Sequence, residues 1–508
     1  MGVRTIATMA VAAVGLCSLA RAAQGTFDVR QYGAKGDGRT LDTVAIQSSI
    51  NAAHAAGGGI VLLPRGVYLT GSLHLKSHVD LRIEAGATLL GSTSRSDYQK
   101  GRWYALLIAD NQEDIAISGS GTIDGQGREL VRDIIRRIQS GELADPMRGN
   151  RPDEKQRPLI IEFHNCRRVK VTGVTVRNSS CWVQNYIDCE DLAIDHIRVE
   201  STAYWNNDGI DIYDCKRVRI ANVDINAADD GICLKSGKAA GGCEDVEVVN
   251  CRVRSSASAF KCGTSSGTAF QKIRVHGLQV YDTYRSAIAL ETVDGAVLRD
   301  VRIEDVRATN TGNAIFLRIG RRNDAAPPGR LEDVVIRDVR VEVPAGKPDE
   351  GYEIAGPPLR HPHNTFPASI VGLPGHPVRN VVLEDMEIVY PGGNQPDVPR
   401  VAVPELGRVP ELESAYPEFS MFGELPAWAF YVRHAEGLEF RNVRVRLQSA
   451  DYRPACVFDD VRGLLLQGVQ TTGDGAAPSI VLNRVSEEKL VGMGDGTKAS
   501  LKVQVTTY

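Results

Sequence analysis

The sequence lacks several features that would assign a protein to a functional class at once. Its formal net charge is only −4, so neither nucleic acid nor a membrane is an expected partner. Its ten cysteines show no zinc-site spacing with a histidine partner, and no glycine-rich segment has the helix and lysine of a phosphate loop. No serine or cysteine triad is recognisable. We therefore expect a soluble monomer that needs no cofactor and no metal.

Long apolar runs are also missing, except at the N-terminus. Arg4 precedes an apolar stretch over residues 6–19, which is too short to span a bilayer comfortably, and Ala20-Arg21-Ala22 has the pattern of a cleavage site. We predict a cleavable signal peptide at residues 1–22. Residues 23–508 would then form the mature protein, secreted or periplasmic, as one domain.

One apolar pattern recurs along most of the chain: two alternating apolar residues, two other residues, then two more alternating apolar residues. Its second apolar position falls at residues 171, 194, 220, 248, 275 and 303. A second series of alternating apolar pairs begins at residues 210, 232, 260, 288 and 315. Self-similarity with a period of this length indicates a solenoid.

Each half of the pattern alternates with a period of two and is rich in Val and Ile, which is typical of strands. The paired turn signals of antiparallel hairpins are missing, so a β-sandwich is not expected. We predict an all-β fold, a right-handed parallel β-helix over residues 23–508. Each coil would pair its backbone with both neighbouring coils and bury its inward side chains on them.

The ends and interruptions of the repeat need separate explanations. Residues 40–56 and 129–140 favour helices, and we expect the first helix to cap the N-terminal opening. Pro-rich segments at 344–378 and 391–428 are expected to be long loop excursions, which usually carry or border function. Three residues in these excursions are candidates for the rim of a binding cleft: His361, His363 and Trp428.

Four cysteines, Cys166, Cys189, Cys215 and Cys243, each open a similar stretch of the repeat. We interpret them as a column of small buried thiols in equivalent turns. A disulfide between Cys243 and Cys251 is the alternative in an oxidising compartment.

Two turns carry candidate catalytic chemistry, Asn207-Asp208-Gly209 and Asp229-Asp230-Gly231. When the coils are aligned on their apolar pairs, Asp208 falls beneath Asp230, and adjacent coils lie about 4.8 Å apart. The three carboxylates would repel one another unless a cation, a shared proton or a substrate offset their charge. Asp-Gly also suits a tight turn without function, but three aspartates stacked in register favour a catalytic site.

Paired carboxylates suit glycoside hydrolysis. One carboxylic acid protonates the leaving oxygen and a carboxylate activates water, about 6.5–9.5 Å away in enzymes that invert the anomeric carbon. Mutual repulsion raises the pKa of one member, which keeps it protonated as the acid.

Further motifs point the same way: Tyr32-Gly33-Ala34-Lys35-Gly36-Asp37-Gly38, and Asn178-Ser179-Ser180 followed by Trp182. Together with the aspartate turns, they resemble glycoside hydrolase family 28, the polygalacturonases and their relatives, over roughly residues 26–470. The resemblance implies a parallel β-helix and an inverting hydrolase of pectin-related polysaccharide or oligosaccharide. It also implies that Asp229 is the general acid and that Asp208 and Asp230 hold and activate water.

Two departures from the family concern the substrate. Ala257-Ser258-Ala259 stands where the family usually has Gly-His-Gly, and Ala289-Leu290-Glu291 stands where it has an Arg-Ile-Lys that grips a uronate carboxylate. Other residues would then contact the substrate, although solvated charges and packing are the alternative for each. The predicted contacts are Asn207, Asp211, Lys235, Lys261, Glu291, Arg318 and, as a stacking ring, Trp205.

Two other functions remain open. A polysaccharide lyase on the same fold would bind Ca²⁺ through oxygen ligands from Asp208, Asp211, Asp229 and Asp230, with a lysine as the base: Lys235 or Lys261. A non-catalytic glycan-binding β-helix would use the same cleft without turnover. The sequence does not separate galacturonan from rhamnogalacturonan-type substrates or endo from exo action, although the long excursions favour exo action.

Overall fold

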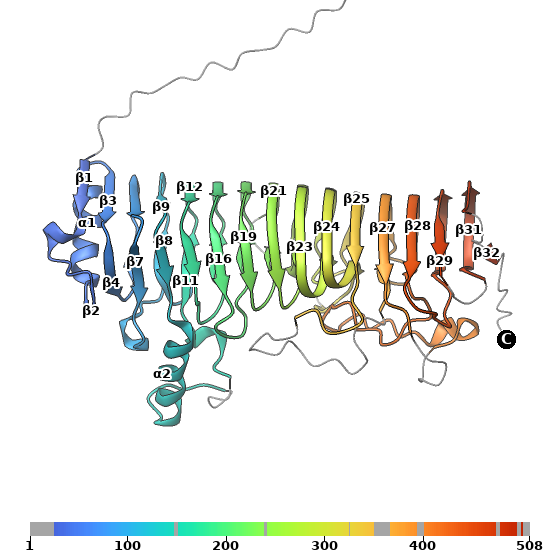
Figure 1. Ribbon diagram of the computed structural model, residues 1–508, viewed down its shortest axis with the longest axis horizontal. Coiled ribbons are helices and arrows are strands. Elements are labelled where there is room, and N and C mark those ends of the chain that lie inside the picture. The colour runs from blue at the N-terminus through green and yellow to red at the C-terminus, as the bar shows by residue number, and fades with distance from the viewer. Residues whose placement is uncertain are drawn as a thin grey trace, which may run out of the picture.

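The structure, a computed structural model, describes residues 25–146, 151–237, 241–324, 326–349, 366–393, 401–473, 478–494 and 499–500. The described strands belong to one sheet that winds into a parallel β-helix, with its coils stacked along the long axis (Figure 1). The prediction of an all-β parallel β-helix is confirmed. The predicted signal peptide lies outside the described residues and stays a prediction.

Short strands build the N-terminal and middle coils, whereas longer continuous strands build most of the later ones. The N-terminal strands are β1 (Gly25–Asp28), β2 (Asp37–Leu41), β3 (Gly59–Leu63), β4 (Gly66–Thr70), β5 (Leu73–His74), β6 (Val79–Ile83), β7 (Ala87–Gly91), β8 (Ala105–Asp110), β9 (Ala116–Gly119) and β10 (Thr122–Asp124). The middle strands are β11 (Leu159–His164), β12 (Arg167–Thr172), β13 (Thr175–Arg177), β14 (Gln184–Ile187), β15 (Glu190–Asp195), β16 (Arg198–Ser201), β17 (Ile210–Tyr213), β18 (Lys216–Ala221), β19 (Asp224–Ala227) and β20 (Ile232–Ser236). The later strands are β21 (Cys243–Ser255), β22 (Phe260–Ser266), β23 (Ala269–Thr292), β24 (Val297–Ile319), β25 (Arg330–Glu342), β26 (Ala368–Val371), β27 (Val378–Tyr390), β28 (Phe430–Leu447), β29 (Cys456–Gln467), β30 (Gln470–Thr472), β31 (Ile480–Val491) and β32 (Ala499–Ser500).

In the described part of the chain two α-helices flank the coils, α1 (Thr43–Ala55) at the N-terminal end and α2 (Gly127–Gln139), which projects from the side (Figure 1). α1 buries Ile46 and Ile50 against the first coils, as expected of a cap. It begins later than residue 40 because residues 37–41 form β2. No described helix is long and apolar enough to span a membrane. Short 3-10 helices are η1 (Val29–Tyr32), η2 (Arg95–Asp97), η3 (Glu154–Gln156) and η4 (Val403–Arg408), the last with a kink at Glu405.

The register of the coils follows the two apolar series. The first series pairs in order at residues 171, 194, 220, 248, 275 and 303. The second pairs at residues 210, 232, 260, 288 and 315. These inward side chains are almost fully buried, and each contributes about 1.5–3 kcal/mol by leaving water. A shift of one residue would turn the whole apolar set outward, which is why the pattern alone fixes the register.

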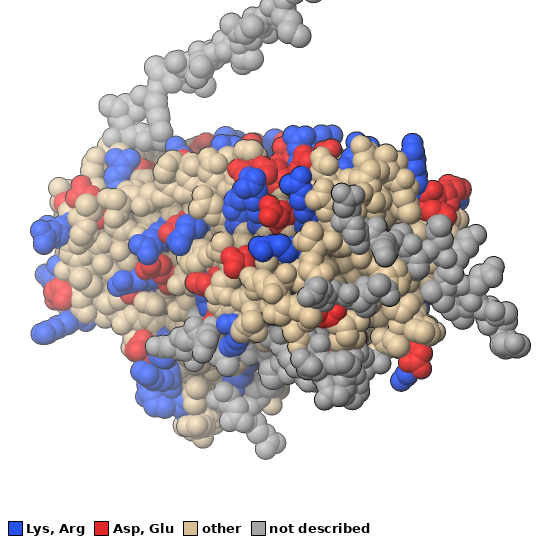
Figure 2. Space-filling model, turned by 45° about the vertical axis from the view of Figure 1, so that its right-hand side comes forward, with Lys and Arg blue, Asp and Glu red and all other residues tan. Residues whose placement is uncertain are grey.

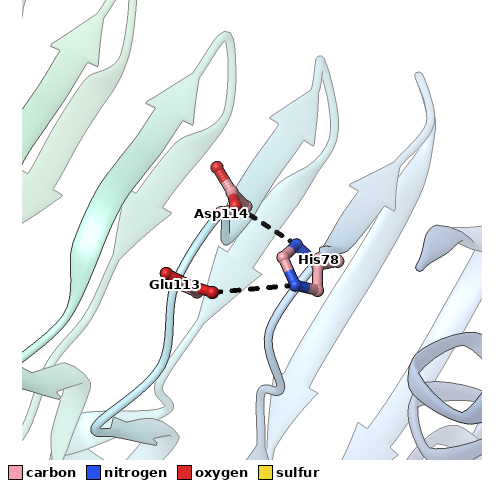
Figure 3. Close-up of side chains that lie close together, drawn as sticks. All are labelled: His78, Glu113 and Asp114. Atoms are coloured by element: carbon pink, nitrogen blue, oxygen red, sulfur yellow. Dashed lines mark ion pairs between the residues drawn. The ribbon is translucent and has the colours of Figure 1, made fainter. Parts of the chain in front are cut away.

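Charged side chains of alternating sign stack at the turns between coils, and Figure 2 shows both signs side by side on one face. In one such stack His78 lies 3.2 Å from Asp114 and 3.9 Å from Glu113 (Figure 3). Arg168, one coil further on, lies 2.7 Å from each of these carboxylates. Because Arg168 already pairs with both acids, the cluster is explained as a surface ladder, in which each exposed pair contributes little stability.

All nine cysteines in the described part of the chain are free and buried. Cys215 donates its thiol to the Tyr186 carbonyl oxygen at 3.2 Å, and its sulfur accepts the Cys189 N–H at 3.3 Å. The predicted column of buried thiols is therefore confirmed, and the alternative disulfide between Cys243 and Cys251 is not formed.

Candidate active site

A cleft of about 410 Å³ lies over β14, β17 and β20. Asp208, Asp229 and Asp230 all line it, so the three predicted catalytic residues share one cavity. The other lining residues come from these strands, from β22 and from loops on either side: Arg102, Trp103, Trp182, Asn185, Ile187, Asn206, Asp211, Tyr213, Lys235, Thr264, Ser265 and Tyr416.

The two aspartate turns lie on adjacent coils with the register expected from the sequence. The N–H of Gly209 donates to the carbonyl oxygen of Asp230 at 2.9 Å. Side-chain oxygens of Asp208 and Asp230 lie within 4.8 Å of each other. Glycine is needed between each aspartate and its strand because the turns approach closely: a Cβ on Gly209 would lie 2.6 Å from the carbonyl oxygen of Gly231.

Two lysines place positive charge against this cluster, but unequally. Lys235 Nζ lies 2.9 Å from Asp208 Oδ2, and Lys261 Nζ lies 3.2 Å from Asp230 Oδ2. Asp229 forms no ion pair with any residue that the structure describes, and its Oδ1 accepts the N–H of Asp230 at 3.0 Å. Asp229 is therefore the aspartate of the three without a cation of its own.

Burial and mutual repulsion govern the protonation of the cluster. Burial first, and then the charges of Asp208 and Asp230, raise the pKa of Asp229 to about 7. Burial opposes the ionisation of Asp230, but Lys261 and Arg285 hold its pKa below the ordinary value. Burial also raises the pKa of Asp208 to about 7, against the attraction of its lysine partner. Asp230 is thus held ionised, whereas Asp208 and Asp229 both have raised pKa values and differ in that Asp208 pairs with a lysine.

Four of the predicted substrate contacts surround the aspartates, in two layers. Asp211 and Lys235 line the cleft, with Lys235 Nζ 2.8 Å from Asp211 Oδ1. Lys261 and Glu291 are each 1% exposed and lie behind the cleft, 3.7 Å apart. The structure therefore gives Lys261 and Glu291 contacts with the protein and not with solvent.

The other three predicted contacts do not line the cleft. The buried Asn207 amide donates to the carbonyl oxygen of Cys181 at 2.8 Å, which braces the first aspartate turn. Arg318 is fully buried and donates to the carbonyl oxygen of Gly372 at 3.1 Å. Trp205 is half-buried, and its ring packs against an arginine guanidinium. These three side chains therefore contact other parts of the protein and do not line the cleft.

Sequence analysis missed most of the walls of the cleft. Trp103 and Trp182 meet edge to face with ring centroids 4.8 Å apart. Tyr416 is 52% exposed, and its hydroxyl oxygen accepts the hydroxyl of Thr264 at 3.0 Å. Trp103 and Tyr416 lie in loops outside the repeat, so the register could not place them. The prediction that Trp428 rims the cleft is wrong, because it is buried against Tyr390; His361 and His363 lie outside the described residues.

A buried arginine fixes the loop that precedes Asp208. Arg157, just after η3, is fully buried. Its guanidinium donates to the carbonyl oxygen of Trp205 at 2.7 Å, to that of Ser180 at 3.0 Å and to Asn206 Oδ1 at 2.7 Å. One side chain thus ties the charged excursion after α2 to the catalytic turn.

We expect Arg157→Met to lower kcat about tenfold through loss of orientation at the turn. It should also lower the free energy of unfolding by about 2–3 kcal/mol, because carbonyl groups lose a charged donor. Chemical denaturation and steady-state kinetics measure the two effects. Arg168→Met, at an exposed arginine of the turn ladder, is the control. Wild-type kinetics in the Arg157 variant would contradict the positioning role.

Comparisons with known proteins agree with this geometry. The family model for glycosyl hydrolases family 28 matches residues 58–343. A protein from Vitis vinifera named "Probable polygalacturonase" is 26% identical over 331 residues, which cover 61% of this chain and 60% of that protein. An exopolygalacturonase from Zea mays is 26% identical over 337 residues, which cover 65% of this chain and 69% of the relative.

Among solved structures, the family 28 exopolygalacturonase of Yersinia enterocolitica aligns with a TM-score of 0.58 at 18% identity, covering 92% of this chain and 78% of that one. At this identity the likeness supports the fold alone. The family model, in contrast, covers more than half of the sequence and includes both aspartate turns. The chain belongs to glycosyl hydrolases family 28.

Proposed function

We propose that this protein is an inverting glycoside hydrolase that cuts pectin-related polysaccharide or oligosaccharide of the galacturonan or rhamnogalacturonan type. The observation that carries the proposal is the unequal environment of three aspartates in one cleft. Asp208 and Asp230 each face a lysine, and Asp229 does not. Membership of family 28 and the names of the relatives, polygalacturonase and exopolygalacturonase, support the reaction and the substrate class.

Asp229 is assigned as the general acid. A general acid must carry a proton near the working pH, and a pKa raised to about 7 by burial and by the two other aspartates supplies that condition. The proton passes from the Asp229 carboxyl to the glycosidic oxygen as the bond to the anomeric carbon breaks. The leaving sugar departs as a neutral alcohol, and Asp229 is left as a carboxylate.

Asp208 and Asp230 are assigned to the attacking water. Asp230, whose pKa Lys261 and Arg285 hold below the ordinary value against burial, is ionised and accepts a proton from water as the water oxygen attacks the anomeric carbon. Asp208, in its ion pair with Lys235, helps to hold that water. Ser258, at the turn where the family usually has histidine, donates its backbone N–H to Asp230 Oδ1 at 3.0 Å. The turn therefore supports Asp230 through its backbone, without the imidazole.

The test is product analysis with the purified protein on polygalacturonan and on rhamnogalacturonan fragments. We expect new reducing ends on one of them, and proton NMR of the first products should show the anomer opposite to the linkage in the substrate. Retained configuration would exclude the assigned roles of the aspartates, and no release on either polymer would exclude the substrate class.

The geometry disfavours the lyase alternative. Lys235 occupies the space between Asp208 and Asp211 that a Ca²⁺ ion bound by these oxygens would need. The charges of neighbouring carboxylates also raise the pKa values of Lys235 and Lys261, against the effect of burial, so neither is a free base. An unsaturated product that absorbs in the ultraviolet, formed only with calcium, would reverse this preference.

A non-catalytic glycan-binding protein is the other alternative, and binding without turnover on both polymers would favour it. We also propose that the protein acts from a chain end and that it is exported to the periplasm or the medium. The name of the maize relative, exopolygalacturonase, supports exo action. The pattern of the first 22 residues supports export.

A further inference from the structure

The cleft must recognise its sugar without the Arg-Ile-Lys that the family uses for a uronate. Among the described residues that line the cleft, the cations are Arg102 and Lys235. Lys235 is 17% exposed in its side chain and lies within 2.9 Å of Asp208 and 2.8 Å of Asp211. Its charge is therefore already balanced by two carboxylates of the cluster.

Arg102 is in a different situation. Its side chain is 53% exposed, and its ion pair with Asp188 is long at 3.7 Å. An exposed pair at this distance contributes little energy, so a carboxylate on a ligand can replace Asp188 at small cost. Guanidinium also presents parallel N–H donors that match both oxygens of a carboxylate.

The Arg102 backbone is fixed although its side chain is exposed. The Arg102 N–H donates to Oε1 of Glu162 at 3.3 Å. Glu162 lies on β11 and is 1% exposed. The next residue, Trp103, packs on Ala105 and Ile108 of β8. The loop before β8 is thus tied to two coils, which holds the guanidinium at the mouth of the cleft.

An aromatic wall lies beside this cation. Trp103 and Trp182 line the cleft and are each half-buried, and their rings meet edge to face. Lys235 Nζ lies 5.3 Å from the centre of the Trp182 ring, so this wall extends from Arg102 to the lysine that holds Asp208. Tryptophan faces in a cleft provide a large, rigid surface for the apolar face of a sugar ring.

The position of this wall relates it to the proposed reaction. Asp188, the ion-pair partner of Arg102, follows β14. β14 pairs with β17 and belongs to the coil directly before it. Adjacent coils are about 4.8 Å apart along the axis. Across the cleft, the Arg102 guanidinium lies near the C-terminal end of β14, whereas Asp208 precedes the N-terminal end of β17. A sugar bound at Arg102 would lie in the same cleft as the three aspartates.

We propose that Arg102, Trp103 and Trp182 form a subsite for a sugar that carries a carboxylate, on the N-terminal side of the three aspartates. The inference rests on the proposed function and deepens it, because it names the residues that recognise a uronate in the cleft. Arg102 binds the carboxylate, and the tryptophan wall packs against the ring. Glu291 stands where the family has the Arg-Ile-Lys that grips a uronate carboxylate. The preference for an acidic sugar therefore comes from the loop before β8.

The test measures binding, not turnover. Isothermal titration calorimetry measures the affinity for two ligands, a galacturonate trisaccharide and its fully methyl-esterified form. Both are titrated into Asp229→Asn protein and into protein that carries both Asp229→Asn and Arg102→Met. We expect Arg102→Met to weaken binding of the acidic trisaccharide about 10- to 100-fold, as for the loss of a charged hydrogen bond. Binding of the ester should change less than about twofold. Arg102→Lys should retain part of the preference for the acid.

Arg252→Met is the matched control, because the Arg252 side chain is 50% exposed and lies 3.4 Å from Asp224, away from the cleft lining. It should leave both affinities unchanged. Equal loss for acid and ester, no loss for the acid, or failure of Asp229→Asn protein to bind either ligand would each overturn the subsite. Turnover of the trisaccharide by Asp229→Asn protein would instead overturn the assignment of the general acid, and the binding comparison would still decide on Arg102.

Discussion

Replacing Asp229 by Asn is expected to lower kcat about 100- to 10,000-fold on any glycan that the wild-type protein cuts, the range over which general acid–base catalysis contributes. Asparagine keeps the size of the side chain but has no acidic proton for the leaving oxygen. KM should change little, because the variant alters a group that acts in the transition state. Initial rates of reducing-end release at several substrate concentrations separate the two constants.

Asp224→Asn is the matched control for this variant. Asp224 lies on β19, and its side chain is 43% exposed and pairs with Arg252 outside the cleft lining. The same chemical change should therefore leave kcat unaltered there. If Asp229→Asn and Asp224→Asn proteins were equally active, Asp229 would not be the acid.

The pH dependence of the wild-type protein follows from the same assignment. A carboxyl with a pKa raised to about 7 is protonated below that pH and loses its proton as the pH rises through it. Since only the protonated form of Asp229 serves as the acid, kcat should fall above about pH 7. Asp230 has a lowered pKa and stays ionised throughout this range. A rate that rises steadily from pH 6 to pH 9 would contradict the assigned roles.

The sequence predicted the register of the coils because burial leaves little choice. Val171 pairs with Ile194, and Ile210 pairs with Ile232, as the apolar pattern requires. The position of Asp208 opposite Asp230 follows from that register. Each of these statements depends only on side chains that alternate between the two faces of a strand.

The walls of the cleft could not be predicted in the same way. Trp103 precedes β8 and Tyr416 belongs to an excursion, so neither has an equivalent in the neighbouring coils. The sequence also did not reveal that some residues on the outer face of the coils are buried. Arg318 belongs to a strand column that looks exposed in sequence, but residues of the excursion cover it, and its guanidinium donates to the carbonyl oxygen of Glu411. Contacts between a solenoid and its own loops have no period to reveal them.

The buried pair of Lys261 and Glu291 carries the largest expected effect on stability. Lys261 is 1% exposed and lies 3.2 Å from Asp230 and 3.7 Å from Glu291, both buried. Lys261→Met removes the ammonium and leaves the two carboxylates without it, which should lower the free energy of unfolding by about 3–5 kcal/mol. Denaturant unfolding at pH 8 measures this loss. Lys272→Met breaks an exposed pair with Glu244 and should cost at most about 1 kcal/mol.

Glu291→Gln should behave in the opposite way. Burial raises the pKa of Glu291 to about 7, so ionisation of this group costs the folded state stability as the pH rises from its ordinary pKa of 4.5 through 7. Glutamine cannot ionise, and the variant should gain stability relative to wild type between pH 5 and pH 8. For the same reason, adding Glu291→Gln to Lys261→Met should recover part of the loss at pH 8. If the Lys261 variant unfolded no more easily than the Lys272 variant, or if the second substitution deepened its loss, the ammonium would not be what keeps these carboxylates in the folded interior.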